Sequence, residues 1–147
     1  MFVIDASALL DAALRDRPEW AVAVEDARRQ GLHGPSILAS EVAHVVHKKR
    51  PQEFGATVAL RSAALELLLA QPALAVSDAA HREAAAMIAS TGLSFYDAEY
   101  VAVADRLGFA LVTHDEDMAR VGRQVLGKTR VLDLDGLRQR VKRLAAS

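Results

Sequence analysis

The sequence predicts an α/β fold: a single three-layer α/β/α domain over residues 1–147, with a central parallel sheet between two layers of helices. Short apolar runs alternate with longer helical segments along the whole chain. No Asn-Gly or Asp-Gly hairpin joins two of these runs, so neighbouring strands should be parallel and linked by helices. A length of 147 residues suits one core and is too short for two ordinary domains.

The expected strands are brief and apolar. The first is Phe2-Val3-Ile4, which is too short for a helix and suits a strand buried on both faces. The clearest spans residues 109–113, and Asp115 lies just past its end. Shorter strands are expected near residues 32–33, at 74–76 and at 130–132.

The expected helices fill the segments between the strands, and residues that commonly begin or end helices mark their limits. Pro18 suits a first turn, and Gly31 and Gly108 suit helix ends. Ser36 and Ser94 are expected N-caps, for helices that carry Glu41 and Asp97. The predicted helices cover residues 8–14, 18–31, 36–50, 52–70, 79–89, 94–107, a short segment around 118–121, and 133–146.

Composition excludes several classes of protein. The absence of cysteine rules out disulfides and thiolate metal sites, and it fits a reducing compartment, so we expect a cytoplasmic protein. No apolar stretch is long enough to span a bilayer, and Asp5 interrupts the N-terminal apolar run, so neither membrane association nor a secretory leader is expected. A net charge of −1 argues against a wholly basic coat for nucleic acid.

Acidic residues occupy positions that a parallel sheet would bring together. Asp5 and Asp115 follow two strands, whose carboxyl ends share one edge of the sheet, where α/β folds place ligands. Asp97 follows Ser94 by three residues, as in a capping box. Glu41 lies at the edge of an apolar helical stripe, where a half-buried carboxylate needs a partner.

Each acid also has an ordinary interpretation. Asp5 or Ser7 can simply cap the next helix, Asp97 can serve helix-end amides, and Glu41 can form a boundary salt bridge. Taken together, they predict an all-oxygen cluster whose mutual repulsion a cation would relieve. Hard oxygen ligands suit Mg²⁺ or Mn²⁺, which activate water and stabilise charge in phosphoryl transfer.

The motifs resemble those of the PIN domain and, more closely, of the VapC toxins of type II toxin–antitoxin pairs. The match runs in order along nearly the whole chain, and its most specific parts are the tyrosine-aspartate-alanine helix start and the threonine-x-aspartate strand end. The matching segments are Val3-Ile4-Asp5-Ala6-Ser7, Ser40-Glu41-Val42, the stretch from Ser94 to Ala102, and Leu111-Val112-Thr113-His114-Asp115.

The resemblance implies a metal-dependent endoribonuclease that uses Mg²⁺, with Mn²⁺ as an alternative, and hydrolyses RNA phosphodiesters, with transfer RNA as a family-level substrate. It also implies a homodimer that a cognate VapB-type antitoxin silences. The acidic quartet of the family, which binds metal and carries catalysis, matches Asp5, Glu41, Asp97 and Asp115. Thr113 matches its strand-end hydroxyl and Ser7 a small polar neighbour. Asp117 departs from the pattern as a second acid beside Asp115, although the threonine-x-aspartate spacing favours Asp115.

Two alternatives stay open on the sequence alone. A receiver-like domain would bind Mg²⁺ and be phosphorylated on aspartate, but Asp5 stands alone after its strand and Lys128 precedes its strand. A non-catalytic PIN-like module would keep the fold without turnover. Among the other residues, Phe95 and Tyr96 are expected to pack in the core or in a dimer, and two basic runs, residues 47–50 and 138–143, are expected to be solvated faces.

Overall fold

The structure, a computed structural model, describes residues 1–15, 17–35, 37–49 and 78–147. Within these residues the sheet has four strands, all parallel, in the order β2-β1-β3-β4. The strands are β1 (Phe2–Ile4), β2 (Leu32–His33), β3 (Ala110–Val112) and β4 (Val131–Leu132). The predicted α/β fold with a central parallel sheet is therefore confirmed.

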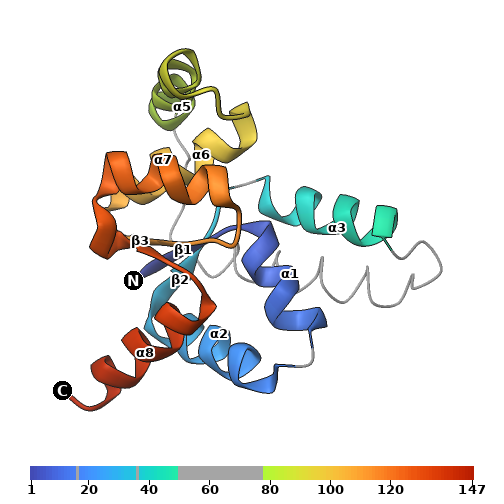
Figure 1. Cartoon of the computed structure of the whole chain (residues 1–147), viewed down its shortest axis with the longest axis vertical. Coiled ribbons are helices and arrows are strands. Elements are labelled where there is room, and N and C mark those ends of the chain that lie inside the picture. Colours follow the sequence, from blue (N-terminus) through green and yellow to red (C-terminus); the bar gives the residue numbers. More distant parts are fainter. Residues whose placement is uncertain (16, 36, 50–77) are drawn as a thin grey trace.

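Helices cover both faces of this sheet, which gives the three expected layers (Figure 1). In Figure 1, α5, α6 and α7 lie on one side of the strands and α1, α2 and α8 on the other. The helices are α1 (Ala6–Leu14), α2 (Pro18–Gly31), α3 (Leu38–Lys49), α5 (Asp78–Thr91), α6 (Phe95–Leu107), α7 (Glu116–Leu126) and α8 (Leu134–Ala145), with a 3₁₀ turn η1 (Lys128–Arg130) before β4.

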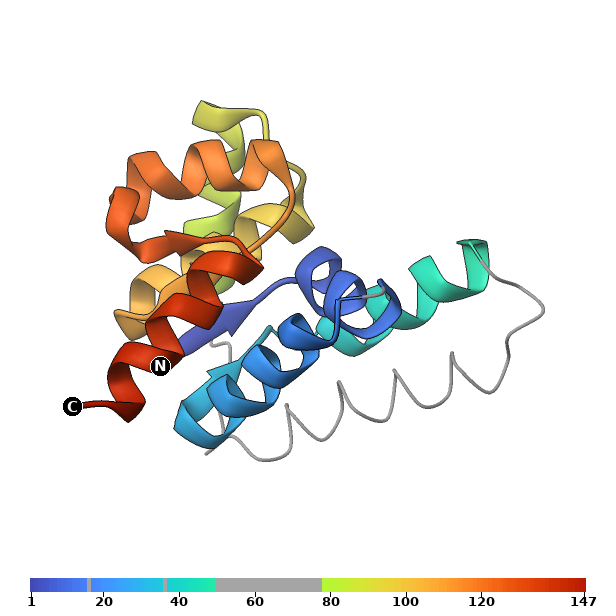
Figure 2. The same ribbon diagram turned by 60° about the horizontal axis from the view of Figure 1, so that its bottom comes forward.

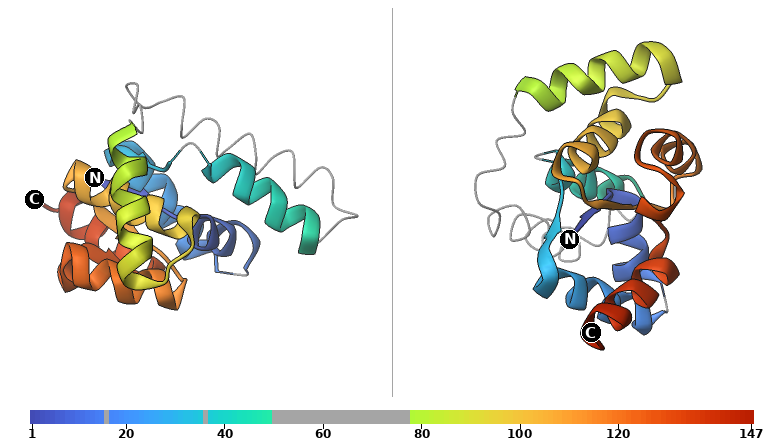
Figure 3. Two further views of the ribbon diagram at one scale, coloured as in Figure 1. Left: turned by 90° about the horizontal axis from the view of Figure 1, so that it is seen from above. Right: turned by 90° about the vertical axis from the view of Figure 1, so that its left-hand side faces the viewer.

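Packing between helices fixes each layer. Helices α2 and α8, from opposite ends of the chain, lie side by side (Figure 2), as do α5 and α6 (Figure 3). Helix α7 lies close to the sheet at Gly122, where an added Cβ would stand 3.2 Å from side-chain atoms of both Leu111 and Val131. A larger residue there would push α7 away from β3 and β4.

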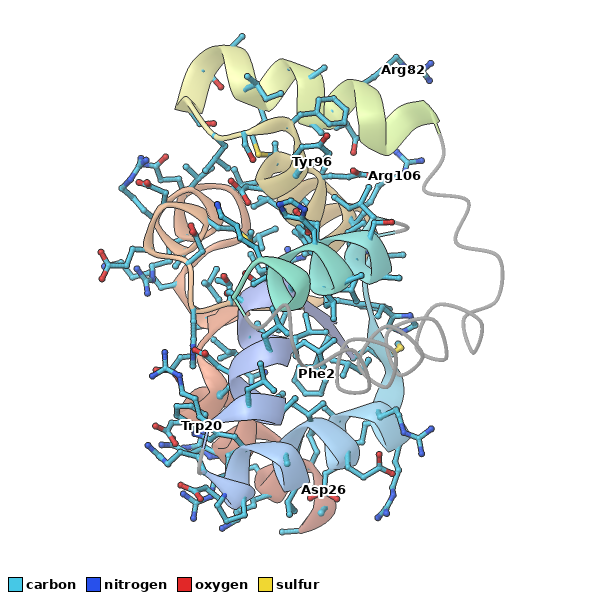
Figure 4. All side chains as sticks on the ribbon, turned by 90° about the vertical axis from the view of Figure 1, so that its right-hand side faces the viewer. Phe2, Trp20, Asp26, Arg82, Tyr96 and Arg106 are labelled. Carbon is cyan, nitrogen blue, oxygen red and sulfur yellow. The ribbon has the colours of Figure 1, made fainter. Side chains whose placement is uncertain are left out.

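The central strands are buried on both faces, as their uninterrupted apolar sequences predict. Phe2, Val3 and Ile4 are each at most 1% exposed, and Leu111 and Val112 are fully buried. Figure 4 shows Phe2 near the middle of the molecule. Fully burying a side chain of this size contributes roughly 1.5–3 kcal/mol to the free energy of folding. The strand ends that carry the polar residues are therefore attached to a stable core.

The register of the two central strands decides which residues leave the sheet together. Ile4 pairs with Val112, so Asp5 and Thr113 come next, at the same edge. The ladder continues one step further, because the amide of Asp5 donates to the carbonyl of Val112 at 3.0 Å.

Most predicted boundaries agree with the structure to within one or two residues. Ser94 caps α6 and Gly108 ends it with a φ of +68°, a left-handed conformation that glycine adopts readily. The predicted strand at 109–113 is shorter, and Arg130 belongs to the 3₁₀ turn. The predicted helix over 52–70, the predicted strand at 74–76 and the cap Ser36 lie outside the described residues. None of the helices in the described segments is long and apolar enough to cross a bilayer.

Candidate functional site

Asp5 is a buried carboxylate, 2% exposed, at the end of β1. Ser7 Oγ and Thr113 Oγ1 both donate to its Oδ2 at 2.7 Å, and the amide of Ala8 donates to Oδ1 at 2.8 Å. Asp5 is therefore the N-cap of α1. The idea that Ser7 caps this helix is wrong: Ser7 lies in the first turn, and its hydroxyl is already committed to Asp5.

The protonation of Asp5 reflects opposing effects. Burial raises its pKa, the three hydrogen bonds lower it, and the negative charge of Asp115 raises it again, so the net shift is upward. A carboxylate offers about four lone-pair positions, so three donors leave about one for a further ligand. Asp5 is thus rigidly held, with about one lone-pair position that these three donors do not use.

Thr113 and Asp115 place a second acid at the same sheet edge. The Thr113 hydroxyl, which donates to Asp5, accepts from the backbone amide of Asp115 at 3.0 Å. Asp115 in turn caps α7, because its Oδ1 accepts from the amide of Met118 at 2.7 Å. One buried hydroxyl therefore fixes the relative positions of both strand-end acids.

His114, between these two residues, is a contact that sequence reasoning missed. Its Nδ1 lies 2.7 Å from Oδ2 of Asp11 on α1, and its Nε2 accepts from the amide of Leu134 on α8 at 3.3 Å. Since Nε2 is an acceptor, Nδ1 carries the proton and donates to Asp11. Burial tends to raise the pKa of Asp11, but hydrogen bonds from His114 and Arg15 lower it overall.

Asp97 is half-buried in the first turn of α6. Its backbone amide donates to Ser94 Oγ at 3.1 Å, and Ser94 Oγ donates to its Oδ2 at 2.6 Å, so the predicted capping box is present. Burial raises the pKa of Asp97, the bond from Ser94 lowers it, and the charges of Asp115 and Asp117 raise it, with a net upward shift. Capping and membership of the acidic cluster are thus compatible.

Glu41 is half-buried on α3, as its place at the edge of the apolar stripe predicts. The hydroxyl of Tyr100 on α6 donates to its Oε2 at 2.5 Å. Burial raises the pKa of Glu41, the bond from Tyr100 lowers it, and the charges of Asp97, Asp5 and Glu99 raise it, for a net rise. Sequence reasoning missed Tyr100; its position three residues after Asp97, on the same side of the helix, was the available signal.

The four predicted acids form one electrostatically coupled group, defined here as the acidic cluster of Asp5, Glu41, Asp97 and Asp115. Repulsion links Asp5 to Asp115, Glu41 to Asp5 and Asp97, and Asp97 to Asp115. All four also lie at the N-cap or in the first turn of a helix. The positive ends of four helix dipoles therefore offset part of this repulsion.

The acidic cluster is not a preformed metal cage. Among residues 1–15, 17–35, 37–49 and 78–147, no three carboxylate or histidine side chains are placed so that they could hold one metal ion. Each of the four acids accepts at least one hydrogen bond from a hydroxyl or a backbone amide.

The remaining predicted residues lie around the acidic cluster. The side chain of Asp117 is 78% exposed and pairs with Arg120 at 3.1 Å, so Asp117 is an outer residue whose charge still reaches Asp97. Phe95 and Tyr96 are 39% and 57% exposed, so the expectation that they pack in the core of this chain is wrong. The expectation that they pack in a dimer stays a prediction.

Comparison with known proteins agrees with this geometry. The family model for the PIN domain matches residues 2–124. The chain belongs to the PIN domain family. PIN domains are generally a metal-dependent nuclease fold, and the acidic cluster lies within the matched residues. No protein with a curated description matches the sequence.

Among solved structures, the crystal structure of PAE2754 from Pyrobaculum aerophilum is similar to this PIN domain, with a TM-score of 0.65. The match covers 99% of this chain and 97% of that one, at 24% sequence identity. At this identity the likeness supports the fold and says nothing about substrate or partners.

Proposed function

We propose that the protein is a metal-dependent endoribonuclease and the toxin of a VapBC-type toxin–antitoxin pair. The observation that carries the nuclease proposal is the convergence of Asp5, Glu41, Asp97 and Asp115 on one sheet edge, with upward pKa shifts at three of them that mutual repulsion reinforces. Carboxylates with perturbed pKa values cluster at functional sites.

The donor set fits a hard divalent cation. All four side chains offer carboxylate oxygens, and the chain has no cysteine. Mg²⁺ and Mn²⁺ prefer such oxygen ligands. In this proposal the acidic cluster holds the ion, which would lower the pKa of water and neutralise the charge that develops on the phosphate.

The chain's own groups prepare that chemistry. Ser7 and Thr113 hold Asp5 in one orientation. Glu41 would orient the attacking water for in-line displacement at the phosphodiester, either as a metal ligand or as a base that contacts the water without binding the metal. As in the family, the products would carry a 5′-phosphate and a 3′-hydroxyl.

The toxin role rests on the closer likeness of the motifs to VapC proteins. It brings with it a cytoplasmic RNA substrate, with transfer RNA as the first to test, a homodimer and a VapB-type antitoxin. A short open reading frame directly upstream that encodes a small DNA-binding protein would support this role. Its absence would weaken the toxin role and leave the nuclease proposal intact.

Cleavage of a labelled RNA panel with and without Mn²⁺ tests the nuclease. Asp97→Asn should abolish cleavage, because it removes one charge of the acidic cluster while keeping the shape of the side chain. Asp105→Asn is the matched control: it lies on the same helix, its side chain is 52% exposed, and it pairs with Arg130 rather than with the acidic cluster. Full cleavage by Asp97→Asn, with a circular dichroism spectrum like that of the parent, would refute the assignment.

The same experiment separates the alternatives. The family match already disfavours the receiver-like domain, which would form an acyl phosphate on aspartate. A non-catalytic PIN-like module would bind RNA or protein and leave every RNA in the panel intact at all Mn²⁺ concentrations.

A further inference from the structure

Tyr100 differs from the other residues around the acidic cluster because its ring is buried in the core while its hydroxyl makes a hydrogen bond to one of the acids. It is 1% exposed and is the largest fully buried side chain among the described residues. It comes from α6, yet its hydroxyl reaches Glu41 on α3. A buried phenol keeps its hydroxyl only where that group has a partner.

The hydroxyl of Tyr100 can act only as a donor to Glu41. The two oxygen atoms lie 2.5 Å apart. An ionised carboxylate is an acceptor only, so the phenol supplies the hydrogen of this bond. The contact therefore fixes one oxygen of Glu41, Oε2, against the ring of Tyr100.

Tyr100 connects the structural elements that carry three members of the acidic cluster, Asp5, Glu41 and Asp97. Helix α6, which carries Tyr100, packs against β1, the strand that Asp5 follows. Through its hydroxyl Tyr100 also contacts the first turn of α3, and it lies one turn from Asp97 along α6. Within the part of the chain that the structure describes, Tyr100 is the one side chain that donates to Glu41, and Oε1 of Glu41 accepts no hydrogen bond.

We propose that Tyr100 is a positioning residue: by holding Oε2 of Glu41, it fixes the carboxylate so that Oε1 is presented to the cation and water of the active site. This inference rests on the proposed function. Without the hydroxyl, Glu41 would rotate among several conformers, and ordering it would oppose metal binding. Loss of a group that orients a metal ligand typically weakens metal affinity or activity about 10–100-fold.

Mn²⁺ binding, measured by isothermal titration calorimetry on the full chain, tests this without any RNA. Tyr100→Phe removes one oxygen atom and keeps the packing of the ring. The dissociation constant for Mn²⁺ should rise roughly 10–100-fold. Tyr96, labelled in Figure 4, lies on the same helix. Tyr96→Phe is the matched control, because it removes the same atom from a residue that is 57% exposed, and its Mn²⁺ binding should equal that of the parent.

A double-mutant cycle with Glu41→Gln separates positioning from general weakening of the fold. If Tyr100 acts through Glu41, adding Tyr100→Phe to Glu41→Gln should cause little or no further loss of Mn²⁺ binding. An equal loss in both backgrounds would overturn the proposal. In cleavage assays the parent and Tyr100→Phe should differ in kcat and in the Mn²⁺ needed for half-maximal rate, with little change in KM for RNA.

The failure of this inference differs from that of the proposed function. Parent-like Mn²⁺ binding by Tyr100→Phe, together with weakened binding by Glu41→Gln, would overturn the role of Tyr100 alone. Parent-like binding by both variants would overturn the role of Glu41 in the proposed site and, with it, the role of Tyr100.

Discussion

The acidic cluster has two halves that are built differently. The strand-borne acids, Asp5 and Asp115, follow adjacent parallel strands and cap the helices that come next. The helix-borne acids, Glu41 and Asp97, lie in the first turns of α3 and α6 and are half-buried. The first pair shares the Thr113 hydroxyl, whereas each member of the second pair has a hydroxyl donor of its own.

This difference shows where precision in the site comes from. Asp5 and Asp115 are placed by strand register and by backbone amides, which the rigid central sheet fixes to within narrow limits. Glu41 is placed by a side chain from another helix, so its position depends on how α3 packs. We therefore expect the strand-borne acids to contribute most of the affinity for the cation and the helix-borne acids to change that affinity by smaller amounts.

Neutralising Asp5 should have the largest effect. Asp5→Asn keeps the Oδ1 acceptor for the Ala8 amide, so α1 stays capped, but it removes the most buried charge of the acidic cluster. Mn²⁺ affinity should fall at least about 100-fold, more than the loss expected from an outer-shell residue. Calorimetry of Asp5→Asn beside Glu41→Gln measures the contrast. A greater loss in Glu41→Gln would reverse the proposed division of roles.

The pH dependence of stability should show the electrostatic cost of burying these carboxylates close to one another. Asp5, Glu41 and Asp97 have folded pKa values above their unfolded values, so the folded protein binds these protons more tightly. Their stabilising contribution is present in full below the unfolded pKa values, near pH 4, and is lost as pH rises through the raised folded values.

Urea unfolding of the parent and of Asp97→Asn in EDTA, from pH 4 to 8, measures this effect. The variant lacks one titrating acid, so its free energy of unfolding relative to the parent should increase with pH over this range. Mn²⁺ should raise the stability of the parent and reduce that advantage. A difference that stays constant with pH would show that neither burial nor repulsion raises the pKa of Asp97 in the folded protein.

Removing His114 should destabilise the fold without acting on the acids directly. His114→Ala loses the bond to Asp11, the bond from the Leu134 amide and the edge contact with Trp20, whose ring centroid lies 5.3 Å away. The free energy of unfolding should fall by roughly 1–3 kcal/mol. His44→Ala, at an exposed position on α3, is the control. An unchanged melting temperature would mean that the turn between β3 and α7 needs no such anchor.

The smallest effect should come from Asp117. Its side chain is 78% exposed, and an exposed ion pair such as that with Arg120 contributes roughly 0–1 kcal/mol. Asp117→Asn should therefore keep Mn²⁺ affinity within about twofold. Asp115→Asn should weaken it at least about tenfold, because losing a residue that merely supports a metal ligand already costs about 10–100-fold. Equal losses in the two variants would show that either acid can serve the strand-borne half.

Residues near in sequence made the strand-borne half predictable. An apolar run followed by an acid, as in Ile4-Asp5, indicates a buried strand and its polar end, because side chains in a two-sided sheet cannot be polar until the strand leaves it. The alternation of strands and helices then places Asp115 at the same edge. The capping box of Ser94 and Asp97 is likewise a local pattern, and the structure contains it.

Contacts between distant segments were decided only by the tertiary structure. Helical spacing indicated that Glu41 is half-buried, but not that its partner would be Tyr100, and the His114–Asp11 contact was missed altogether. Asp5 rather than Ser7 caps α1 because the Ala8 amide donates to Asp5 Oδ1, while Thr113, from a distant part of the chain, holds the other carboxylate oxygen. Periodicity in a sequence reports which face of an element is buried, whereas the partner of a buried polar group depends on how separate elements pack.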